Sequence, residues 1–547
     1  MTLLLPVSRR GLLSAAAVAA PTLFLPGRAN AAEYVTVETS DGILRGVRDR
    51  TAVTFKGVPY AADTGGRNRF LAPRPVTRWT GVRDALQFGD RCVQVRRTDG
   101  PFAASPATWS ENCCVLNVYT PSLNAHARRP VIVYFHGGGF RAGSGDAPDL
   151  NGVNLASFGD VVVVTLNHRL NAFGYCNLGF LDPDFIDAPN AGQLDLIAAL
   201  KWVRTNIERF GGDPGNVTIS GQSGGGSKCI ALQLAPSAAG LFRRSINLSG
   251  SSGFGMTHAS VREEATLELL KIFGIGKGEL RKLQEVPADA LLAAHDRAVA
   301  TVKSGDYRPV VDGHHIFHGP LTPEGAALQA SLPSILSNTS SEATLFYPNA
   351  RALSTITFDQ VQARIAKHYG FDMAKASEVM QAFRKEIPTR TPWEVLAEVA
   401  SEAQVTMLMR RGLEMRANAR RAPVYAEEFA WKSPADNGIW GAPHTIDIPC
   451  AFGNIDKNRF TSAGGASVKA ASLNEMSAIV AFARTGNPNN KRMPHWLPYD
   501  SVRRPTMVVD AECRLVNDVR SADRKAAENL RLDDPLTVTQ GALFTGV

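Results

Sequence analysis

One serine of this chain has the neighbours that a catalytic nucleophile needs. Ser223 is the centre of residues 221–225, G-Q-S-G-G, which match the pattern G-x-S-x-G. The pattern comes directly after a short β-branched run, 217–220, and an apolar helical run follows it at 230–234. A sharp turn between a strand and a helix exposes the serine oxygen and tolerates only small neighbours. The segment therefore predicts that Ser223 attacks a carbonyl carbon in an acyl-transfer reaction.

The glycines around this serine also resemble a phosphate-binding loop. Gly221 and Gly226 are spaced as in G-x-x-x-x-G-K-[ST], but Ser227 comes before Lys228, so the last two residues are in reversed order. In a phosphate-binding loop the lysine reaches the phosphates and the hydroxyl after it holds Mg²⁺. The reversed order argues against nucleotide binding.

A triple glycine supplies a second part of acyl-transfer chemistry. A predicted strand leads directly into residues 136–140, H-G-G-G-F. Glycines let the backbone turn its N–H groups toward a ligand, and this pattern ahead of a serine turn is typical of lipases and esterases. We expect the N–H groups of Gly138, Gly139 and Gly224 to bind the oxyanion. His136 precedes the serine in the chain and is interpreted as a support for the loop rather than as the catalytic base.

A serine nucleophile also needs a carboxylate and a histidine. In enzymes whose serine lies at such a strand-to-helix turn, the carboxylate and then the histidine follow the serine in the chain. His444 lies in a breaker-rich loop after the predicted strand 424–429, a position that suits a catalytic imidazole. Glu342 lies on a polar loop after the short predicted strand 334–336, and Asp312 is its rival. The carboxylate would fix the tautomer of the histidine and stabilise the imidazolium. From the residues alone the choice between the two acids stays open.

Three other histidines are close together in the chain, at His314, His315 and His318. The dipeptides D-G at 312–313 and G-P at 319–320 surround them, so this segment predicts a solvated turn rather than a metal site. The seven cysteines contain no C-x-x-C pair and no cluster with histidine at metal-ligand spacing. We therefore expect neither a metal nor an organic cofactor.

The elements that hold these residues can be predicted from short apolar runs. Runs rich in β-branched residues predict buried strands, and the clearest lie at 131–135, 161–165, 217–220, 245–248 and 424–429. Apolar residues at spacings of three and four predict a helix over 193–209. Strand, helix and strand in succession indicate a parallel crossover. The predicted fold class is α/β, with a central, mostly parallel sheet flanked by helices.

Taken together, the chain resembles the type-B carboxylesterase and cholinesterase-like family, whose members have the α/β-hydrolase fold. The resemblance extends over most of the mature chain and rests on many segments in the same order. These segments are 55–61, 110–113, 116–121, 136–140, 167–170, 210–214, 221–225, 441–444 and 485–488.

The resemblance implies a triad of Ser223, Glu342 and His444, and it selects Glu342 over Asp312. It also implies a disulfide between Cys92 and Cys113. Three positions depart from the family pattern, because acidic, alanine and glycine residues are usual there. These positions hold Gln222, Gly224 and Ala343.

One large folded unit over 32–547 is the simpler prediction, because no linker or repeat divides the chain. Helix-rich excursions near 251–332 and 357–420 are expected to cap the substrate pocket. We expect Phe140, Phe254 and Gln222 to contribute to the pocket.

The first residues differ from the rest. Arg9 and Arg10 precede the uncharged stretch 11–25, and small residues at 29–31 fit a signal-peptidase site. Paired arginines before a weakly hydrophobic stretch predict a twin-arginine signal peptide over 1–31, and hence export of a folded protein to the periplasm or the exterior. No later run is long enough for a membrane helix.

The formal net charge of +8 is spread along the chain, so nucleic acid is not an expected partner. The sequence predicts a serine hydrolase that cleaves small carboxylic esters through an acyl-enzyme. The alternatives are an amidase or thioesterase with the same triad, and a non-catalytic cholinesterase-like binding protein. The natural substrate and the oligomeric state are not predicted.

Overall fold

The computed structural model describes residues 33–49, 51–95, 108–302, 307–347, 349–385 and 387–529. The predicted signal peptide at 1–31 lies outside these ranges. Within the described residues, thirteen strands form one sheet in the order β1-β2-β3-β5-β7-β6-β8-β9-β10-β11-β12-β13, and β4 pairs with β2. The strands are β1 (Glu33–Glu38), β2 (Ile43–Arg48), β3 (Val53–Pro59), β4 (Val82–Asp84), β5 (Val115–Thr120), β6 (Arg129–Phe135), β7 (Val162–Leu166), β8 (Gly212–Gln222), β9 (Arg244–Leu248), β10 (Ser334–Thr339), β11 (Val424–Phe429), β12 (Pro505–Val509) and β13 (Arg514–Asn517).

The middle of the sheet is parallel and its edges are antiparallel. All neighbours from β7 to β12 pair in parallel. The strands β1, β2, β3, β5 and β7 pair antiparallel in that order, as do β12 and β13, and only the short strand β4 pairs in parallel with β2 at the edge. The helices are α1 (Val153–Gly159), α2 (Asn171–Tyr175), α3 (Ala191–Asn206), α4 (Gly224–Leu234), α5 (Glu263–Phe273), α6 (Ala288–Thr301), α7 (Pro323–Gln329), α8 (Ala350–Leu353), α9 (Phe358–Tyr369), α10 (Met373–Arg384), α11 (Pro392–Ser401), α12 (Met407–Ala419), α13 (Asp447–Phe452), α14 (Gly465–Thr485) and α15 (Ser521–Asn529). The sequence-based prediction of an α/β fold with a mostly parallel sheet is confirmed.

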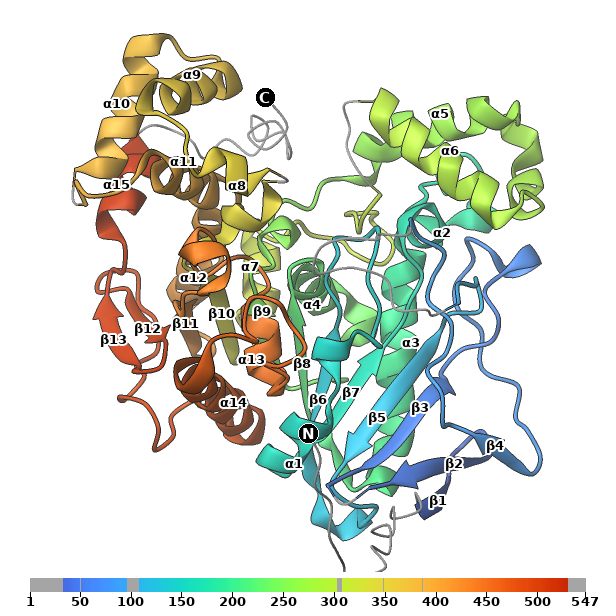
Figure 1. The fold of residues 1–547 in the computed structure, drawn as a ribbon. Coiled ribbons are helices and arrows are strands. Elements are labelled where there is room, and N and C mark those ends of the chain that lie inside the picture. Colours follow the sequence, from blue (N-terminus) through green and yellow to red (C-terminus); the bar gives the residue numbers. More distant parts are fainter. Residues whose placement is uncertain are drawn as a thin grey trace, which may run out of the picture.

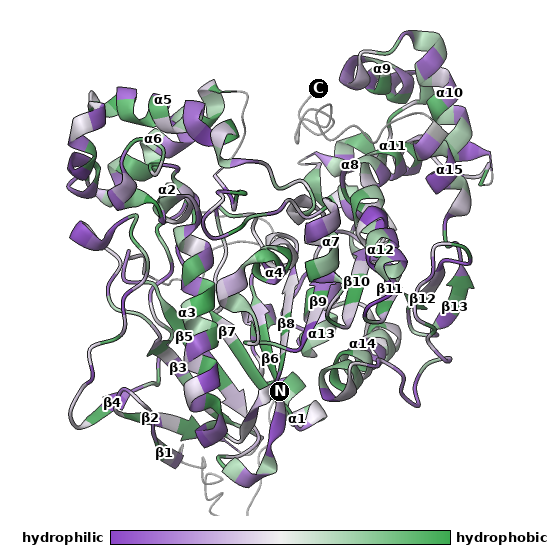
Figure 2. Cartoon of the chain, turned by 180° about the vertical axis from the view of Figure 1, so that it is seen from behind, coloured by the Kyte–Doolittle hydropathy of each residue, from purple (hydrophilic) through white to green (hydrophobic). Residues whose placement is uncertain are grey.

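Alternation along the strands explains why helices cover both faces. In β6, Ile132 and Tyr134 pack in a core with residues of α1, α13 and α14, whereas Val131 and Val133 pack in a second core with residues of α3, α4 and α12. Successive side chains of a strand point to opposite faces of a sheet, so a strand covered on both faces is apolar throughout. Figure 2 shows hydrophobic colour along the central strands and mixed colour on the peripheral helices α9 and α10.

Helices occupy both stretches where we predicted excursions from the core. Helices α5, α6 and α7 lie between β9 and β10, and α9 to α12 lie between β10 and β11. Figure 1 shows α5 and α6 on one side above the sheet, and α9, α10 and α15 on the other side. The strand β8 ends between these two groups. No helix among the described residues is long and apolar enough to cross a membrane.

The expected disulfide between Cys92 and Cys113 is not formed in the structure, where both cysteines are buried free thiols. They nevertheless lie together, in one small buried core with Leu170. The neighbouring thiols and burial raise the pKa of the Cys113 thiol. Cys114, the next residue in the chain, packs in a different core, with residues of β3 and β5.

Candidate active site

Ser223 lies at the turn between β8 and α4, as the sequence predicts. Its backbone has φ 57° and ψ −125°, a conformation that side chains rarely adopt, and its N–H donates to the carbonyl of Leu248 at 2.7 Å. Small neighbours permit this turn, because a Cβ on Gly225 would lie 2.0 Å from the carbonyl oxygen of Phe135. The strained backbone holds the serine at the end of β8, above the start of the following helix.

Glu342 and His444 are in direct contact. Oε2 of Glu342 lies 2.5 Å from Nδ1 of His444, and both side chains are buried. Oε1 of Glu342 accepts hydrogen bonds from Oγ of Ser249 at 2.5 Å and from the N–H of Thr339 at 2.7 Å. An N–H at Nδ1 of His444 that donates to Oε2 of Glu342 fixes the tautomer of the ring, and Nε2 is then the nitrogen that can accept a proton.

The acid and the base come from neighbouring loops that the backbone joins directly. Glu342 follows β10 and His444 follows β11, and these two strands pair in parallel. The N–H of Ser341 donates to the carbonyl of Ala442 at 3.0 Å, and Oγ1 of Thr344 donates to the carbonyl of Trp440 at 2.7 Å. The carboxyl ends of parallel strands meet at one edge of a sheet, which places residues distant in sequence side by side.

The rival acid Asp312 has a structural position instead. Its Oδ1 accepts the N–H groups of His314, His315 and Ile316, and its Oδ2 accepts from Nδ2 of Asn190 at 2.7 Å. It thus closes the turn that the sequence predicts around these histidines, and it has no contact with His444. Of the two acids that the sequence leaves open, Glu342 is the one that contacts His444.

The same turn brings two histidines to a carboxylate that the sequence does not indicate. Nε2 of His315 lies 2.7 Å from Oδ1 of Asp187, and Nε2 of His314 lies 4.0 Å from it. Side-chain atoms of these three residues that are able to ligate a metal lie within 4.8 Å of one another. Neither His318 nor any of these three residues lines the cavity beside Ser223.

The loop that we expect to bind the oxyanion, residues 136–140 (the oxyanion loop), follows β6 and lies against the start of α4. Gly138 and Gly139 have φ values of 86° and 66°, and within the described ranges their N–H groups donate to no acceptor. The carbonyl of Gly139 packs so closely on Gly224 that a Cβ there would lie 2.1 Å from its oxygen. Glycine at 224, a departure from the family pattern, therefore matches the close approach of this loop.

Gln222 lies against the imidazole of His444 and is completely buried. Its Nε2 is 3.2 Å from Nε2 and 3.4 Å from Nδ1 of the histidine. An atom nearly equidistant from both ring nitrogens lies over the ring face, because an in-plane approach would overlap the carbon between them. The amide therefore packs on the ring and adds no second negative charge beside Glu342, unlike the acidic residue usual in the family.

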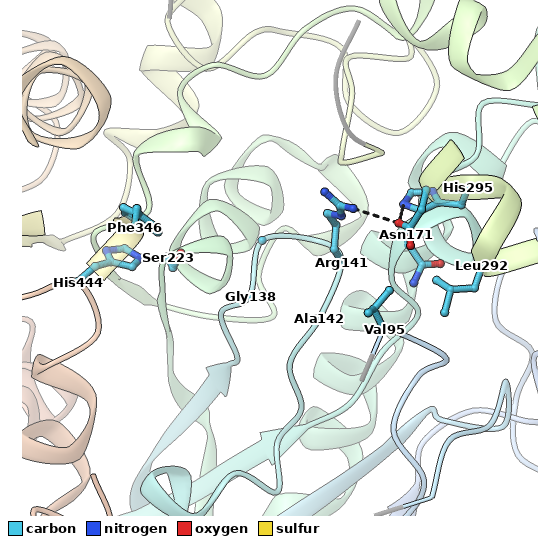
Figure 3. Close-up of a pocket in the computed structure, with 12 residues that line it drawn as sticks. Val95, Gly138, Arg141, Ala142, Asn171, Ser223, Leu292, His295, Phe346 and His444 are labelled. Carbon is cyan, nitrogen blue, oxygen red and sulfur yellow. Dashed lines mark hydrogen bonds and ion pairs between the residues drawn. The ribbon is translucent and has the colours of Figure 1, made fainter. Parts of the chain in front are cut away.

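A cavity of about 460 Å³ opens beside Ser223. In Figure 3, His444, Ser223 and Phe346 lie on one side, Asn171, Leu292 and His295 lie on the other side, and Arg141 lies between them. The lining residues are Val95, Gly138, Gly139, Arg141, Ala142, Asn171, Ser223, Leu292, His295, Asp296, Phe346 and His444.

The three expected pocket residues are not part of this lining, and each has a packing reason. Phe140 is buried edge-to-face against Tyr175 at 5.3 Å between ring centroids. Phe254 is 3% exposed and packs on Gly412 of α12. Gln222 is covered by the imidazole of His444. The expectation that these side chains form the pocket wall is therefore corrected, since all three belong to the layer behind it.

Sequence reasoning missed the residues that do form the wall. Phe346 is 38% exposed and its ring lies 4.9 Å from that of His444. Arg141, just after the oxyanion loop, forms an ion pair with Asp296 of α6 at 3.0 Å. A signal for Arg141 was available, because it directly follows H-G-G-G-F. The residues of α6 had no such signal, since the fold alone brings this helix to the cavity.

A further buried acid lies close to the triad. Asp447, three residues after His444, is wholly buried in the first turn of α13. Burial, followed by the negative charge of Glu342, raises the pKa of Asp447 to about 7. The site thus contains two buried carboxyl groups: Glu342 contacts the imidazole, and Asp447 holds its proton more tightly than a free aspartate does.

The nucleophile turn, the carboxylate–imidazole pair and the glycine loop at one sheet edge define a serine hydrolase of the α/β-hydrolase class. Comparison with known proteins agrees. The model of the carboxylesterase family matches residues 33–528. The chain belongs to this family and is a carboxylic-ester hydrolase.

The relatives cover nearly the whole described chain. A para-nitrobenzyl esterase of Bacillus subtilis is 34% identical over 512 residues, which are 89% of this chain and 97% of that protein. A phenmedipham hydrolase of Pseudarthrobacter oxydans is 30% identical and covers 90% of this chain and 98% of its own. The solved carboxylesterase of Geobacillus stearothermophilus has a TM-score of 0.77 at 31% identity, covering 90% of this chain and 99% of that one.

Proposed function

We propose that Ser223, Glu342 and His444 are the catalytic triad of this esterase. The observation that carries the proposal is the buried contact of 2.5 Å between Oε2 of Glu342 and Nδ1 of His444, at the cavity that Ser223 also lines. Nε2 of His444 takes the proton of Ser223 while the serine oxygen attacks the ester carbonyl. The N–H groups of Gly138, Gly139 and Gly224 hold the oxyanion of the tetrahedral intermediate.

The imidazolium of His444 then protonates the departing alkoxide, and the acyl group stays on Ser223. Water, deprotonated by the same imidazole, attacks the acyl-enzyme and releases the acid. Hydrogen bonds from Ser249 and Thr339 hold Glu342 in place against Nδ1 of His444 through both halves. This chain's own residues supply every group in the scheme.

Hydrolysis of a series of p-nitrophenyl acyl esters by the mature protein tests this assignment. Ser223→Ala should lower turnover by several orders of magnitude, because the covalent step needs the serine oxygen. A fluorophosphonate that labels Ser223, followed by mass spectrometry of the labelled peptide, identifies the nucleophile directly. An unchanged rate in folded Ser223→Ala, or a label at another residue, would discard the triad.

The alternatives of an amidase and a thioesterase use the same groups and differ only in the leaving group. Matched ester, thioester and anilide substrates with one acyl chain measure the preference directly. We propose the ester as the substrate, in keeping with the family. A higher kcat/KM for the thioester or the anilide would replace it.

We propose in addition that residues 1–31 direct the folded protein out of the cytoplasm. The support is the pair Arg9 and Arg10 ahead of the uncharged stretch 11–25. Expression in a bacterium with a twin-arginine translocase should place ester hydrolysis in the periplasmic fraction. Replacing both arginines by lysine should retain it in the cytoplasm, whereas equal export of both forms would contradict the proposal.

Export would also expose Cys92 and Cys113 to an oxidising environment, and we propose that they then form a disulfide. The packing of both cysteines in one small buried core supports this pairing, and a disulfide typically adds about 3 kcal/mol for a loop of this size. Peptide mapping of exported protein without reductant should find Cys92 linked to Cys113. A link from Cys92 to Cys114, or free thiols, would refute the pairing.

A further inference from the structure

Lys228 is a buried cation without a counter-ion. It lies in the first half of α4, five residues after Ser223, and its side chain is 0% exposed. Within the described part of the chain, no carboxylate pairs with its ammonium group. Burying an ammonium group costs free energy unless the group is paired or hydrogen-bonded. Burial lowers the pKa of Lys228 to about 7.

The groups around Lys228 are neutral, so its contacts are few and specific. The imidazoles of His136 and His168 stack at 5.1 Å, and burial together with the nearby cation lowers the pKa of both. Burial raises the pKa of the neighbouring thiol, Cys229, far above neutrality. None of these groups is an anion at neutral pH, which leaves backbone carbonyls and aromatic faces as partners for the ammonium.

The contacts that Lys228 makes are with the two ends of the oxyanion loop. Its Nζ donates to the carbonyl of His136, the first residue of the loop, at 2.8 Å. The same Nζ lies 5.3 Å from the ring centroid of Phe140, the last residue of the loop. Between these anchors lie Gly138 and Gly139, whose φ values are positive and whose backbone can adopt many other conformations, because neither residue has a Cβ.

We propose that Lys228 is a positioning residue for the oxyanion hole, and that it holds loop 136–140 so that the N–H groups of Gly138 and Gly139 face the substrate carbonyl. The inference deepens the proposed function and rests on it. Triple glycine is flexible, and donors work in an oxyanion hole only when they are held in place before the reaction. A cation that bonds the first residue of the loop and faces the last one restricts the glycines between them. Lys228, which makes the segment resemble a phosphate-binding loop, therefore acts on the oxyanion loop from behind Ser223.

The test replaces Lys228 by methionine, which has nearly the same length and no donor. Lys228→Met should lower kcat for p-nitrophenyl acetate by about 10- to 100-fold, below the loss of a whole oxyanion donor, with little change in KM. Affinity for a trifluoromethyl ketone, which binds Ser223 as a tetrahedral oxyanion, should fall by a similar factor. The melting temperature should be equal or higher, because an unpaired buried charge is removed.

Arg416 provides a matched control, because it is another buried cation and contacts Gln233, Gln329 and Ser334 rather than the oxyanion loop. Arg416→Met should lower the melting temperature while kcat of the folded enzyme stays unchanged. If Lys228→Met instead loses activity only in proportion to its unfolded fraction, or keeps full kcat, the positioning role is wrong.

A readout independent of turnover separates this inference from the triad. Hydrogen exchange of the peptide that contains 136–142 should be faster in Lys228→Met than in the wild type, since the loop loses both anchors. Unchanged exchange would overturn the role of Lys228 even if Ser223 proves to be the nucleophile. If exchange is faster in Lys228→Met but wild type and Ser223→Ala hydrolyse the ester equally, Lys228 does hold the loop and the proposed triad is wrong.

Discussion

Oε2 of Glu342 lies 2.5 Å from Nδ1 of His444, although the two residues are 102 positions apart in the chain. This contact fixes which nitrogen of the imidazole carries the proton, and so which one is free to act as a base. We predict that Glu342→Gln lowers kcat by about 10³- to 10⁴-fold with little change in KM, because the amide favours the wrong tautomer. Asp312→Asn is the matched control and should keep kcat, since Asp312 only closes a turn. Steady-state kinetics of both folded variants decide between the two acids.

Gly224→Ala restores the residue usual in the family and should still impair this enzyme. The new Cβ would lie 2.1 Å from the carbonyl oxygen of Gly139, so the oxyanion loop has to move. We expect kcat to fall by about 10-fold or more, because misplaced donors stabilise the oxyanion less. Gly278→Ala, with nothing within 4 Å of its Cβ, is the control and should be silent. Equal kcat values for Gly224→Ala, Gly278→Ala and the wild type would mean that the oxyanion loop can move to make room for the new Cβ without loss of activity.

The two phenylalanines Phe346 and Phe254 should respond in opposite ways to truncation. Phe346 lines the cavity, so Phe346→Ala should shift the preferred p-nitrophenyl acyl chain toward longer esters while the melting temperature changes little. Phe254 is 3% exposed in the core, so Phe254→Ala should lower stability by about 3–5 kcal/mol and leave the preference unchanged. If only Phe254→Ala shifts the preferred acyl-chain length, Phe254 rather than Phe346 lines the substrate pocket.

Arg141 places a positive charge in the cavity, held by the ion pair with Asp296. Esters whose acyl part ends in a carboxylate should gain from this charge, whereas neutral esters of equal length should not. Because the guanidinium is 48% exposed, the effect should be modest. We predict that Arg141→Met lowers kcat/KM for p-nitrophenyl hemisuccinate about 5-fold relative to p-nitrophenyl butyrate. A ratio equal to that of the wild type would exclude the charge from recognition.

Asp447 should make stability depend on pH. Its pKa is about 7 in the folded protein and near 3.8 as a free side chain, so the folded state binds its proton more tightly. The stabilising effect of that proton is complete below about pH 4 and is lost as pH rises through 7. Asp447→Asn should therefore raise the melting temperature at pH 8 more than at pH 5. If Asp447→Asn changes the melting temperature equally at both pH values, folding does not raise the pKa of Asp447.

The sequence could predict those parts of the site that local chemistry dictates. The glycines around Ser223 and at 137–139 are required by the backbone itself, through a positive φ or a close approach, so they are visible as patterns. The strands were equally visible, since a parallel strand buried on both faces is apolar throughout. The sequence could not predict that Phe346 lines the pocket while Phe140 and Phe254 lie in the core, because a phenylalanine in a core and one in a pocket have the same local sequence pattern.

Read alone, the sequence determined the nucleophile turn, the oxyanion loop and the fold class, because each depends on the type and spacing of adjacent residues. Only the tertiary structure decided which acid contacts His444, that Phe346 rather than Phe254 lines the cavity, and that Lys228 contacts His136 and Phe140. These relationships join residues from different strands and helices. Such contacts are set by how parallel strands align their ends and how helices pack over them, and no local pattern records that arrangement.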